Sequence, residues 1–141
     1  MNTQNKQNTL TIRAAAENLE TVQTFVDECL EAVGCPMKAQ MQIDVAVEEI
    51  FVNIASYAYA PGTGDAAVCV QLPEDDSAVT ISFTDRGKPY DPLSRDDPDI
   101  SLPAEQRDVG GLGILMTKKL MDELSYEYTD GQNVLTMKKK L

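Results

Sequence analysis

The stretch IDVAVEEIFVNIASYAY, residues 43–59, decides the fold because it predicts a long helix with one apolar face. At about 100° per residue, its large apolar residues cluster on that face: Ile43, Val47, Ile50, Ile54 and Tyr57. Glu49 and Asn53 lie one turn apart on the flank of this face, whereas Glu48 points elsewhere and is expected to face solvent. The simpler interpretation of Glu49 and Asn53 is a polar pair on a wet surface, and a functional interpretation requires a partner site elsewhere in the chain.

Hydrophobic periodicity around this helix, which opens at Pro36, predicts the remaining elements of a single domain. We expect strands at 9–14, 66–72, 78–83, 125–129 and 133–141, and further helices at 18–33 and 112–124. Asp130 and Gly131 form a turn signal between the last two strands. The sequence shows no internal repeat, so we expect one domain over residues 9–141 after a flexible segment, residues 1–8.

Composition narrows the class of protein. A chain of 141 residues with 43% hydrophobic content is long enough for one core without staples. Its three cysteines, Cys29, Cys35 and Cys69, are odd in number and lack CxxC spacing, which favours reduced thiols packed as small core residues. The N-terminus has no apolar leader and no later segment is apolar enough to cross a bilayer, so we expect a soluble, cytoplasmic protein without membrane contact.

Charge and histidine content exclude several functions. The formal net charge of −11 repels a phosphate backbone, and no basic patch interleaved with aromatic residues is present, so nucleic-acid binding is not expected. The chain contains no histidine, which excludes Ser-His-Asp catalysis, histidine-ligated metals and a phosphohistidine step within it. The remaining catalytic groups are carboxylates, amides, hydroxyls, lysine, arginine and backbone.

A long polar loop, residues 85–108, separates the predicted hairpin from the glycines GGLG at 110–113. Connections longer than about 12 to 15 residues are uncommon in compact domains unless they act as lids or binding loops or are disordered. Glycines at a helix N-terminus expose N–H groups with roughly half a positive charge, which suits a phosphate. GGLG alone is weak evidence, and a flexible turn before a helix is the simpler interpretation of it.

Three motifs in order resemble a known family. They are E-x-x-x-N on a helix (Glu49, Asn53), D-x-G-x-P at a strand end (Asp85, Gly87, Pro89) and GGLGI at 110–114. This order resembles the N, G1 and G2 boxes of the GHKL ATPase superfamily, and in particular the small bacterial anti-sigma factor serine/threonine kinases, over about residues 9–141. The resemblance implies a histidine-kinase-like (Bergerat-type) ATPase fold: a two-layer α/β sandwich, with a mixed, mostly antiparallel sheet and helices on one face.

The resemblance also implies roles for individual residues. Asn53 would ligate Mg²⁺ through its amide oxygen, and Glu49 would accept the proton of an attacking serine or threonine hydroxyl. Asp85 would accept a hydrogen bond from the adenine amino group, and Gly87 would let the base approach the backbone. The phosphates of ATP would lie against Gly110, Gly111, Leu112 and Gly113. Arg107 is a further candidate for the terminal phosphate, although a solvated lid arginine is the simpler interpretation.

The implied function is an ATP-dependent protein kinase that phosphorylates a small STAS-like anti-anti-sigma antagonist in a partner-switching system. A sigma factor is the implied second partner, and a homodimer the implied assembly. Two alternatives remain open: a nucleotide-binding anti-sigma or partner-binding module without kinase activity, and a structural domain without a ligand. A sensor histidine kinase would need a phosphoacceptor histidine and dimerisation helices, which this sequence lacks.

The chain departs from the family pattern at three places. Tyr57 stands where relatives commonly have a histidine, and Asp108 and Val109 precede the glycines without the arginine seen in many relatives. Gln132 and Asn133 follow Gly131, where relatives often have Gly-Thr before the final strand. The last change removes a hydroxyl that the family uses around the nucleotide, and these departures bear more on kinase efficiency than on nucleotide binding.

Overall fold

The computed structural model describes residues 6–72, 77–94 and 111–141. In chain order, the elements are β1 (Lys6–Arg13), η1 (Ala16–Asn18), α1 (Leu19–Ala32), α2 (Met37–Asn53), η2 (Ile54–Ala58), β2 (Asp65–Leu72), β3 (Ala78–Asp85), η3 (Pro92–Ser94), α3 (Gly111–Leu120), β4 (Glu123–Thr129) and β5 (Gln132–Lys140). The predicted order of helices and strands is therefore confirmed. β1 begins at Lys6 rather than at residue 9, because residues 6–8 pair with the end of β2.

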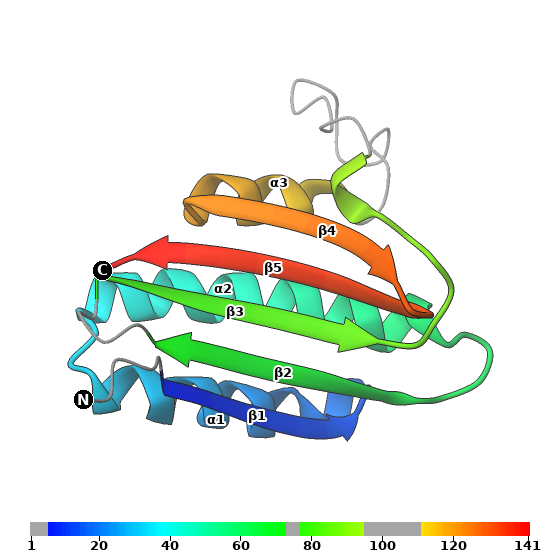
Figure 1. Cartoon of the computed structure of the whole chain (residues 1–141), viewed down its shortest axis with the longest axis horizontal. Coiled ribbons are helices and arrows are strands. Elements are labelled where there is room, and N and C mark those ends of the chain that lie inside the picture. Colours follow the sequence, from blue (N-terminus) through cyan, green and yellow to red (C-terminus); the bar gives the residue numbers. More distant parts are fainter. Residues whose placement is uncertain (1–5, 73–76, 95–110) are drawn as a thin grey trace.

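Among the described residues, five strands form one sheet in the order β1-β2-β3-β5-β4 (Figure 1). The sheet was expected to be mixed and mostly antiparallel, and each of its pairings is antiparallel. β5 lies between β3 and β4, so the first residues of β5 lie beside the last residues of β3. This register places Asn133 opposite Asp85.

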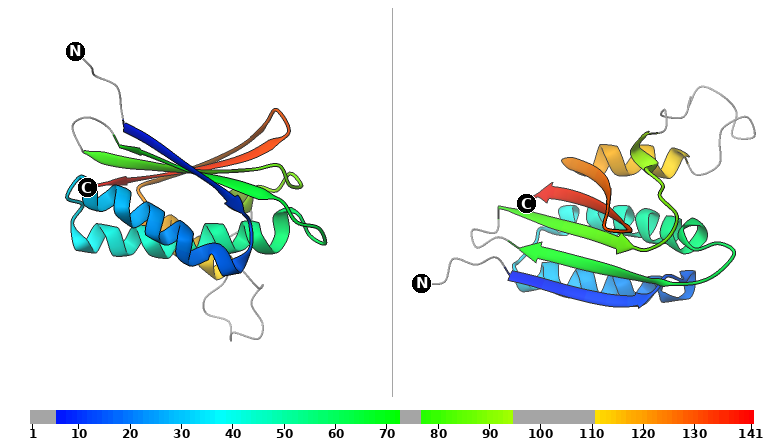
Figure 2. Two further views of the ribbon diagram at one scale, coloured as in Figure 1. Left: turned by 90° about the horizontal axis from the view of Figure 1, so that it is seen from below. Right: turned by 45° about the vertical axis from the view of Figure 1, so that its right-hand side comes forward.

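The molecule has two layers, with α1, α2 and α3 on one face of the sheet (Figures 1 and 2). Strand residues alternate accordingly. Val68, Ile81 and Phe83 on the helix side are buried, whereas Thr80 and Ser82 on the other side are only partly buried. An antiparallel sheet with one solvated face takes this alternation, and the predicted two-layer sandwich is confirmed.

The core lies between the three helices and the sheet. Ile43, Val47 and Ile50 are buried as predicted, and Ile54 packs against the core from its edge. The prediction was wrong for Tyr57, which is 53% exposed. The helix changes at Ile54 from α to the π-helical turn η2, so the spacing of about 100° per residue no longer holds there.

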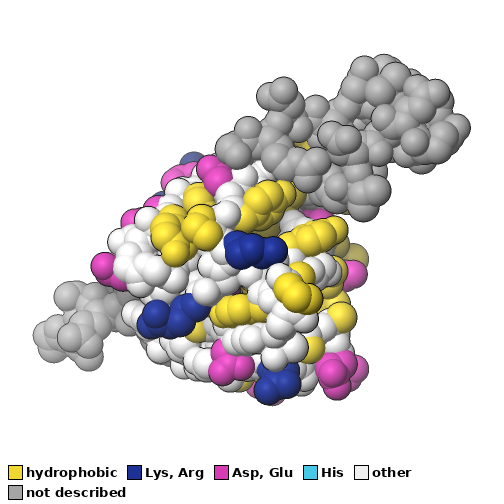
Figure 3. Space-filling model, turned by 90° about the vertical axis from the view of Figure 1, so that its right-hand side faces the viewer, with side chains coloured by type: hydrophobic (Ala, Val, Ile, Leu, Met, Phe, Trp, Pro, Cys, Tyr) yellow, Lys and Arg dark blue, Asp and Glu magenta, His cyan; other side chains and the backbone are white. Residues whose placement is uncertain are grey.

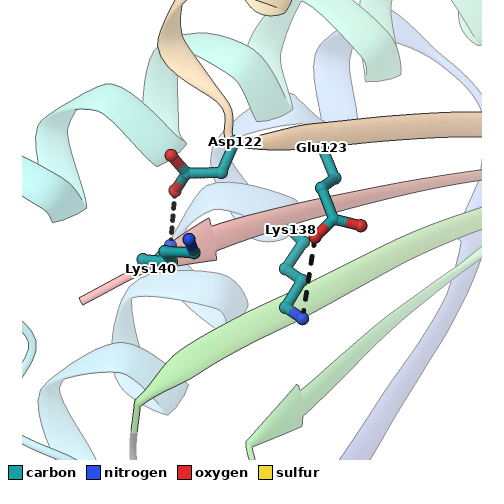
Figure 4. A network of polar contacts seen from close by, with 4 residues as sticks. All are labelled: Asp122, Glu123, Lys138 and Lys140. Carbon is teal, nitrogen blue, oxygen red and sulfur yellow. Dashed lines mark hydrogen bonds and ion pairs between the residues drawn. The ribbon is translucent and has the colours of Figure 1, made fainter.

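The C-terminal hairpin ends α3 earlier than the sequence pattern predicts. The helix stops at Leu120, whose carbonyl accepts a hydrogen bond from Lys139 Nζ at 2.6 Å, a cation at a helix C-terminus. Beyond it, the Lys140 N–H donates to Asp122 Oδ2 at 2.6 Å, and Lys138 pairs with Glu123 at 3.8 Å (Figure 4). The residues after Leu120 therefore bond to β5 and lead into β4 instead of continuing the helix.

All three cysteines, Cys29, Cys35 and Cys69, are free thiols. In the described ranges, no helix has the length and apolar character required to cross a lipid bilayer.

Candidate functional site

A cavity of about 520 Å³ opens at the end of the molecule where α2 and β3 finish and β5 begins. At this end, hydrophobic side chains gather with a few basic ones, and acidic side chains lie mainly toward the margins (Figure 3). The walls are formed by Ile50, Asn53, Ile54, Tyr57, Ala58, Ala60, Phe83, Asp85, Lys88, Pro89, Tyr90, Pro92, Tyr126, Asn133 and Leu135. The mainly apolar lining with a few polar groups is typical of a small-molecule site.

Asp85, the last residue of β3, is a charged residue in this largely apolar wall and is only 6% exposed. Its Oδ1 accepts hydrogen bonds from the Gly87 N–H at 2.8 Å and from Asn133 Nδ2 at 2.9 Å. No described residue donates to its Oδ2. A buried carboxylate with one oxygen held by the protein can offer the other oxygen to a ligand donor.

Asn133, the second residue of β5, links Asp85 to the chain that follows β3. Besides Asp85, its Nδ2 donates to the Lys88 carbonyl at 2.9 Å and lies 3.4 Å from the Gly87 carbonyl. Its Oδ1 accepts hydrogen bonds from the Tyr90 N–H at 3.2 Å and from the Tyr126 hydroxyl. The sequence pattern singled out Asn133 only as a departure and did not predict it as a site residue.

Asn53 and Glu49 keep the spacing that the sequence indicates. Asn53, the last residue of α2, is half-buried and lines the same cavity as Asp85. Glu49 lies one turn earlier, is also half-buried and is not among the residues that line the cavity. Glu48 is exposed, as predicted. Burial, and next the charge of Glu48, raise the pKa of Glu49.

Asn53 has the chemistry of a magnesium ligand. Its side chain makes no hydrogen bond with other residues in the described part of the chain, so its amide oxygen is available at the cavity wall. Mg²⁺ takes oxygen ligands and is usually bound through one or two protein groups together with water and substrate phosphates. The residues present therefore fit the predicted ion.

Gly87 is a glycine because the chain turns against the end of the central helix. A Cβ at this position would lie 2.2 Å from the Ala58 carbonyl oxygen. That carbonyl accepts a hydrogen bond from the Lys88 N–H at 2.9 Å, which satisfies a group left free at the end of η2. The contact between Gly87 and Ala58 explains the glycine without a ligand, and the role of Gly87 beside a base stays a prediction.

Tyr59 fixes the same corner from the other side. Its hydroxyl donates to the Asp65 carbonyl at 2.6 Å and accepts from the Arg86 N–H at 2.8 Å. The end of the helix, the start of β2 and the end of β3 are thereby held together, which determines where Asp85 lies.

The phosphate side of the predicted site is described only in part. Gly111, Leu112 and Gly113 form the first turn of α3, as predicted. Gly110 and Arg107 lie outside the described residues, as do Asp108 and Val109.

Several cavity residues were not predicted as site residues, and their signals were weak. Tyr126 and Phe83 lie outside every motif, and Lys88 occupies a variable position of the D-x-G-x-P motif. Asn133 comes shortly after the Asp130–Gly131 turn, at the start of the strand whose register places it beside Asp85. Reading that register from sequence requires the strand order, which only the fold supplies.

Comparison with known proteins identifies the family of the chain. Residues 12–139 match a family described as the histidine kinase-like ATPase domain. The chain is 29% identical over 100 residues to the serine/threonine-protein kinase BtrW of Bordetella bronchiseptica, an alignment that covers 71% of this chain and 70% of that protein. It is 24% identical over 134 residues to the serine-protein kinase RsbW of Listeria monocytogenes, covering 92% and 85%.

A solved structure shows the same fold. It is the crystal structure of the RsbU and RsbW domains of Rv1364c from Mycobacterium tuberculosis, which matches with a TM-score of 0.68 at 21% identity. The match covers 96% of this chain and 32% of that longer chain.

Proposed function

The chain belongs to the histidine kinase-like ATPase domain family, and on this premise we propose that it is an ATP-dependent serine/threonine kinase of the anti-sigma factor type. Its substrate would be a serine or threonine of a small STAS-like antagonist protein, and a sigma factor would be its other partner in the cytoplasm. The carrying observation is that Asn53 and Asp85, from α2 and β3, line one cavity. The kinase names of the relatives support the proposal.

Asp85 would hold the adenine end of ATP. Its Oδ2, free among the described residues, would accept a hydrogen bond from the exocyclic amino group, while Phe83 and Leu135 provide apolar contact at the cavity wall. Gly87 keeps this part of the chain close to Ala58 and so keeps Asp85 in place.

Asn53 would hold Mg²⁺ at the other end of the cavity. The ion supplies positive charge that neutralises the phosphate oxygens during phosphoryl transfer. The N–H groups of residues 110–113 at the start of α3 would bind the phosphates, and Arg107 is a further proposed contact. These local groups can bind an anion although the net charge of the chain is −11.

Glu49 would act as the base. As the substrate oxygen bonds to the terminal phosphorus and the bond to the ADP oxygen breaks, Glu49 would accept the hydroxyl proton. Positioned general bases typically contribute about 10² to 10⁴ in rate. The raised pKa of Glu49 makes its carboxylate a better proton acceptor than an ordinary glutamate.

A partner-binding module that binds nucleotide without transferring phosphate is the second candidate. The position of Glu49, one turn before Asn53 and not among the residues that line the cavity, favours it. In that case ATP would only shape the surface on which the partner docks.

Phosphate transfer from labelled Mg-ATP to candidate antagonist proteins separates the two functions. We expect transfer by the wild type, and a loss of about 10² to 10⁴ in rate for Glu49→Gln. Glu48→Gln, which removes the adjacent exposed carboxylate, is the matched control and should transfer at the wild-type rate on the pH-independent plateau above the acidic limb. Undiminished transfer in Glu49→Gln would remove Glu49 as the base, and ATP binding without transfer would establish the second candidate.

A further inference from the structure

No motif predicts Asn133 or Tyr126 as a site residue. Asn133 bonds both Asp85 and the chain that follows β3, and Tyr126 bonds Asn133 and the same chain. We propose that they are positioning residues that hold Asp85 Oδ1 and residues 88–90 as one unit, and that they thereby make the cavity selective for a base with an exocyclic amino group. This inference rests on the proposed nucleotide site and specifies how that site recognises the base.

The orientation of the Asn133 amide follows from its neighbours. On one side lie acceptors, the Asp85 carboxylate and the Lys88 carbonyl, each 2.9 Å from Nδ2. On the other side lie donors, the Tyr90 N–H and the Tyr126 hydroxyl. Only one assignment of the amide nitrogen and oxygen satisfies all four groups. With Asn133 only 7% exposed, a rotated amide would leave buried groups unpaired.

Tyr126 completes this arrangement from β4. Its hydroxyl donates to Asn133 Oδ1 and accepts from the Tyr90 N–H at 3.2 Å. Burial is the main cause that raises the pKa of Tyr126, so the hydroxyl keeps its proton at neutral pH and remains a donor.

The consequence for Asp85 is an asymmetric carboxylate. Oδ1 already accepts from the Gly87 N–H and from Asn133 Nδ2, which fixes the plane of the carboxylate. Oδ2 is left for a donor from within the cavity. Because Asp85 is only 6% exposed, a base without such a donor would leave a buried charged oxygen unpaired.

The same contacts set the cavity rim. Lys88, Pro89 and Tyr90 all line the cavity, and the Asn133 side chain bonds the backbone of Lys88 and of Tyr90. The residue that orients the recognition carboxylate thus also bonds the wall beside it.

Two ligands that differ by one amino group test the proposal. They are Mg-ATP and the Mg complex of purine riboside triphosphate, which carries hydrogen in place of the 6-amino group. A hydrogen bond to a charged group corresponds to about 10-fold to 100-fold in affinity. We therefore expect the wild type to bind Mg-ATP tighter than the analogue by about that factor.

Tyr126→Phe is the primary variant because it removes only the hydroxyl. We expect its dissociation constant for Mg-ATP to rise about 3-fold to 10-fold, and that of Asn133→Leu about 10-fold to 100-fold. The dissociation constant for the analogue should change less than about 2-fold. Tyr128→Phe, on the same strand but 47% exposed, is the matched control and should behave like the wild type.

The readouts separate selectivity from a merely structural role. If Tyr126→Phe weakens the binding of both ligands equally, or of neither, the proposed role in selectivity is wrong. Equal affinity of the wild type for both ligands would also overturn it. Absence of binding to either ligand by the wild type would instead refute the nucleotide site itself. Thermal unfolding without nucleotide shows whether Asn133→Leu folds. If that variant does not fold, the affinities of Tyr126→Phe for the two ligands test the proposal.

Discussion

Two neighbouring glutamates on α2 show how local environment separates residues of one type. Glu48 is exposed, whereas Glu49 is half-buried one turn from Asn53. Burial raises the pKa of Glu49, and the charge of Glu48 raises it further. Glu48 therefore influences the proposed base without taking part in transfer.

This coupling predicts a shift in the pH dependence of phosphate transfer. A base works in its charged form, so the rate falls as pH decreases through the raised pKa of Glu49. Glu48→Gln removes a repelling charge and lowers the pKa of Glu49, and the acidic limb of the transfer rate should move to lower pH. Measuring kcat from about pH 5 to about pH 9 checks this. Glu20→Gln on α1 is the control, and an unmoved limb would contradict the coupling.

Gly87 tests the packing that places Asp85. In Gly87→Ala, the added Cβ would lie 2.2 Å from the Ala58 oxygen and 2.5 Å from its carbonyl carbon, both backbone atoms. We expect a loss of about 1 to 3 kcal/mol in the free energy of unfolding, together with weaker Mg-ATP binding. Gly62→Ala is the milder comparison in chemical denaturation, because its Cβ would lie 3.3 Å from the Tyr59 carbonyl oxygen. Equal stability of the two variants would contradict this account of the corner.

At the scale of elements, the apolar contact between α1 and α2 also brings two carboxylates close together. Asp27 on α1 and Asp44 on α2 each have one buried oxygen, Oδ1, without a hydrogen-bond partner among the described residues. Burial, then a hydrogen bond with Asp27 and its charge, and finally the charge of Glu31 raise the pKa of Asp44 to about 7. The two helices thus pack best when Asp44 carries a proton.

The sign of the resulting pH dependence follows from linkage. The folded protein binds the Asp44 proton more tightly than the unfolded chain does, so this group lowers stability as pH rises from about 4 to about 7. Asp44→Asn removes the charge. We expect it to be more stable than the wild type by on the order of 1 to 3 kcal/mol at about pH 8, and by less at about pH 5. Denaturant unfolding at both pH values measures this, and a larger gain at the lower pH would contradict it.

For the whole molecule, the sequence predicted the elements well because their patterns are local. The apolar face of the central helix and the alternation in the strands both follow from residues a few positions apart. Tyr57 was misplaced because the change to a π-helical turn leaves no mark in that spacing. α3 was predicted too long because its end depends on Lys139, distant in sequence.

The site residues that belong to sequence motifs were predictable, whereas those brought together by the pairing of distant strands were not. Asn53 and Asp85 were predicted and line one cavity. Asn133 and Tyr126 come together with Asp85 only through the order of β3, β5 and β4, which the sequence does not display. The departure at Asn133 was expected to remove a useful hydroxyl, and the structure places an amide there, hydrogen-bonded to Asp85 and to the Tyr126 hydroxyl.

A calorimetric titration of the full chain with Mg-ATP, for wild type and for Asn53→Ala, tests the central claim that this cavity binds the nucleotide. We expect saturable binding by the wild type that weakens when Mg²⁺ is withheld. Asn53→Ala should bind Mg-ATP at least about 10-fold more weakly, and its affinity should depend less on Mg²⁺. No saturable heat from the wild type, or equal binding by Asn53→Ala with unchanged dependence on Mg²⁺, would contradict the account.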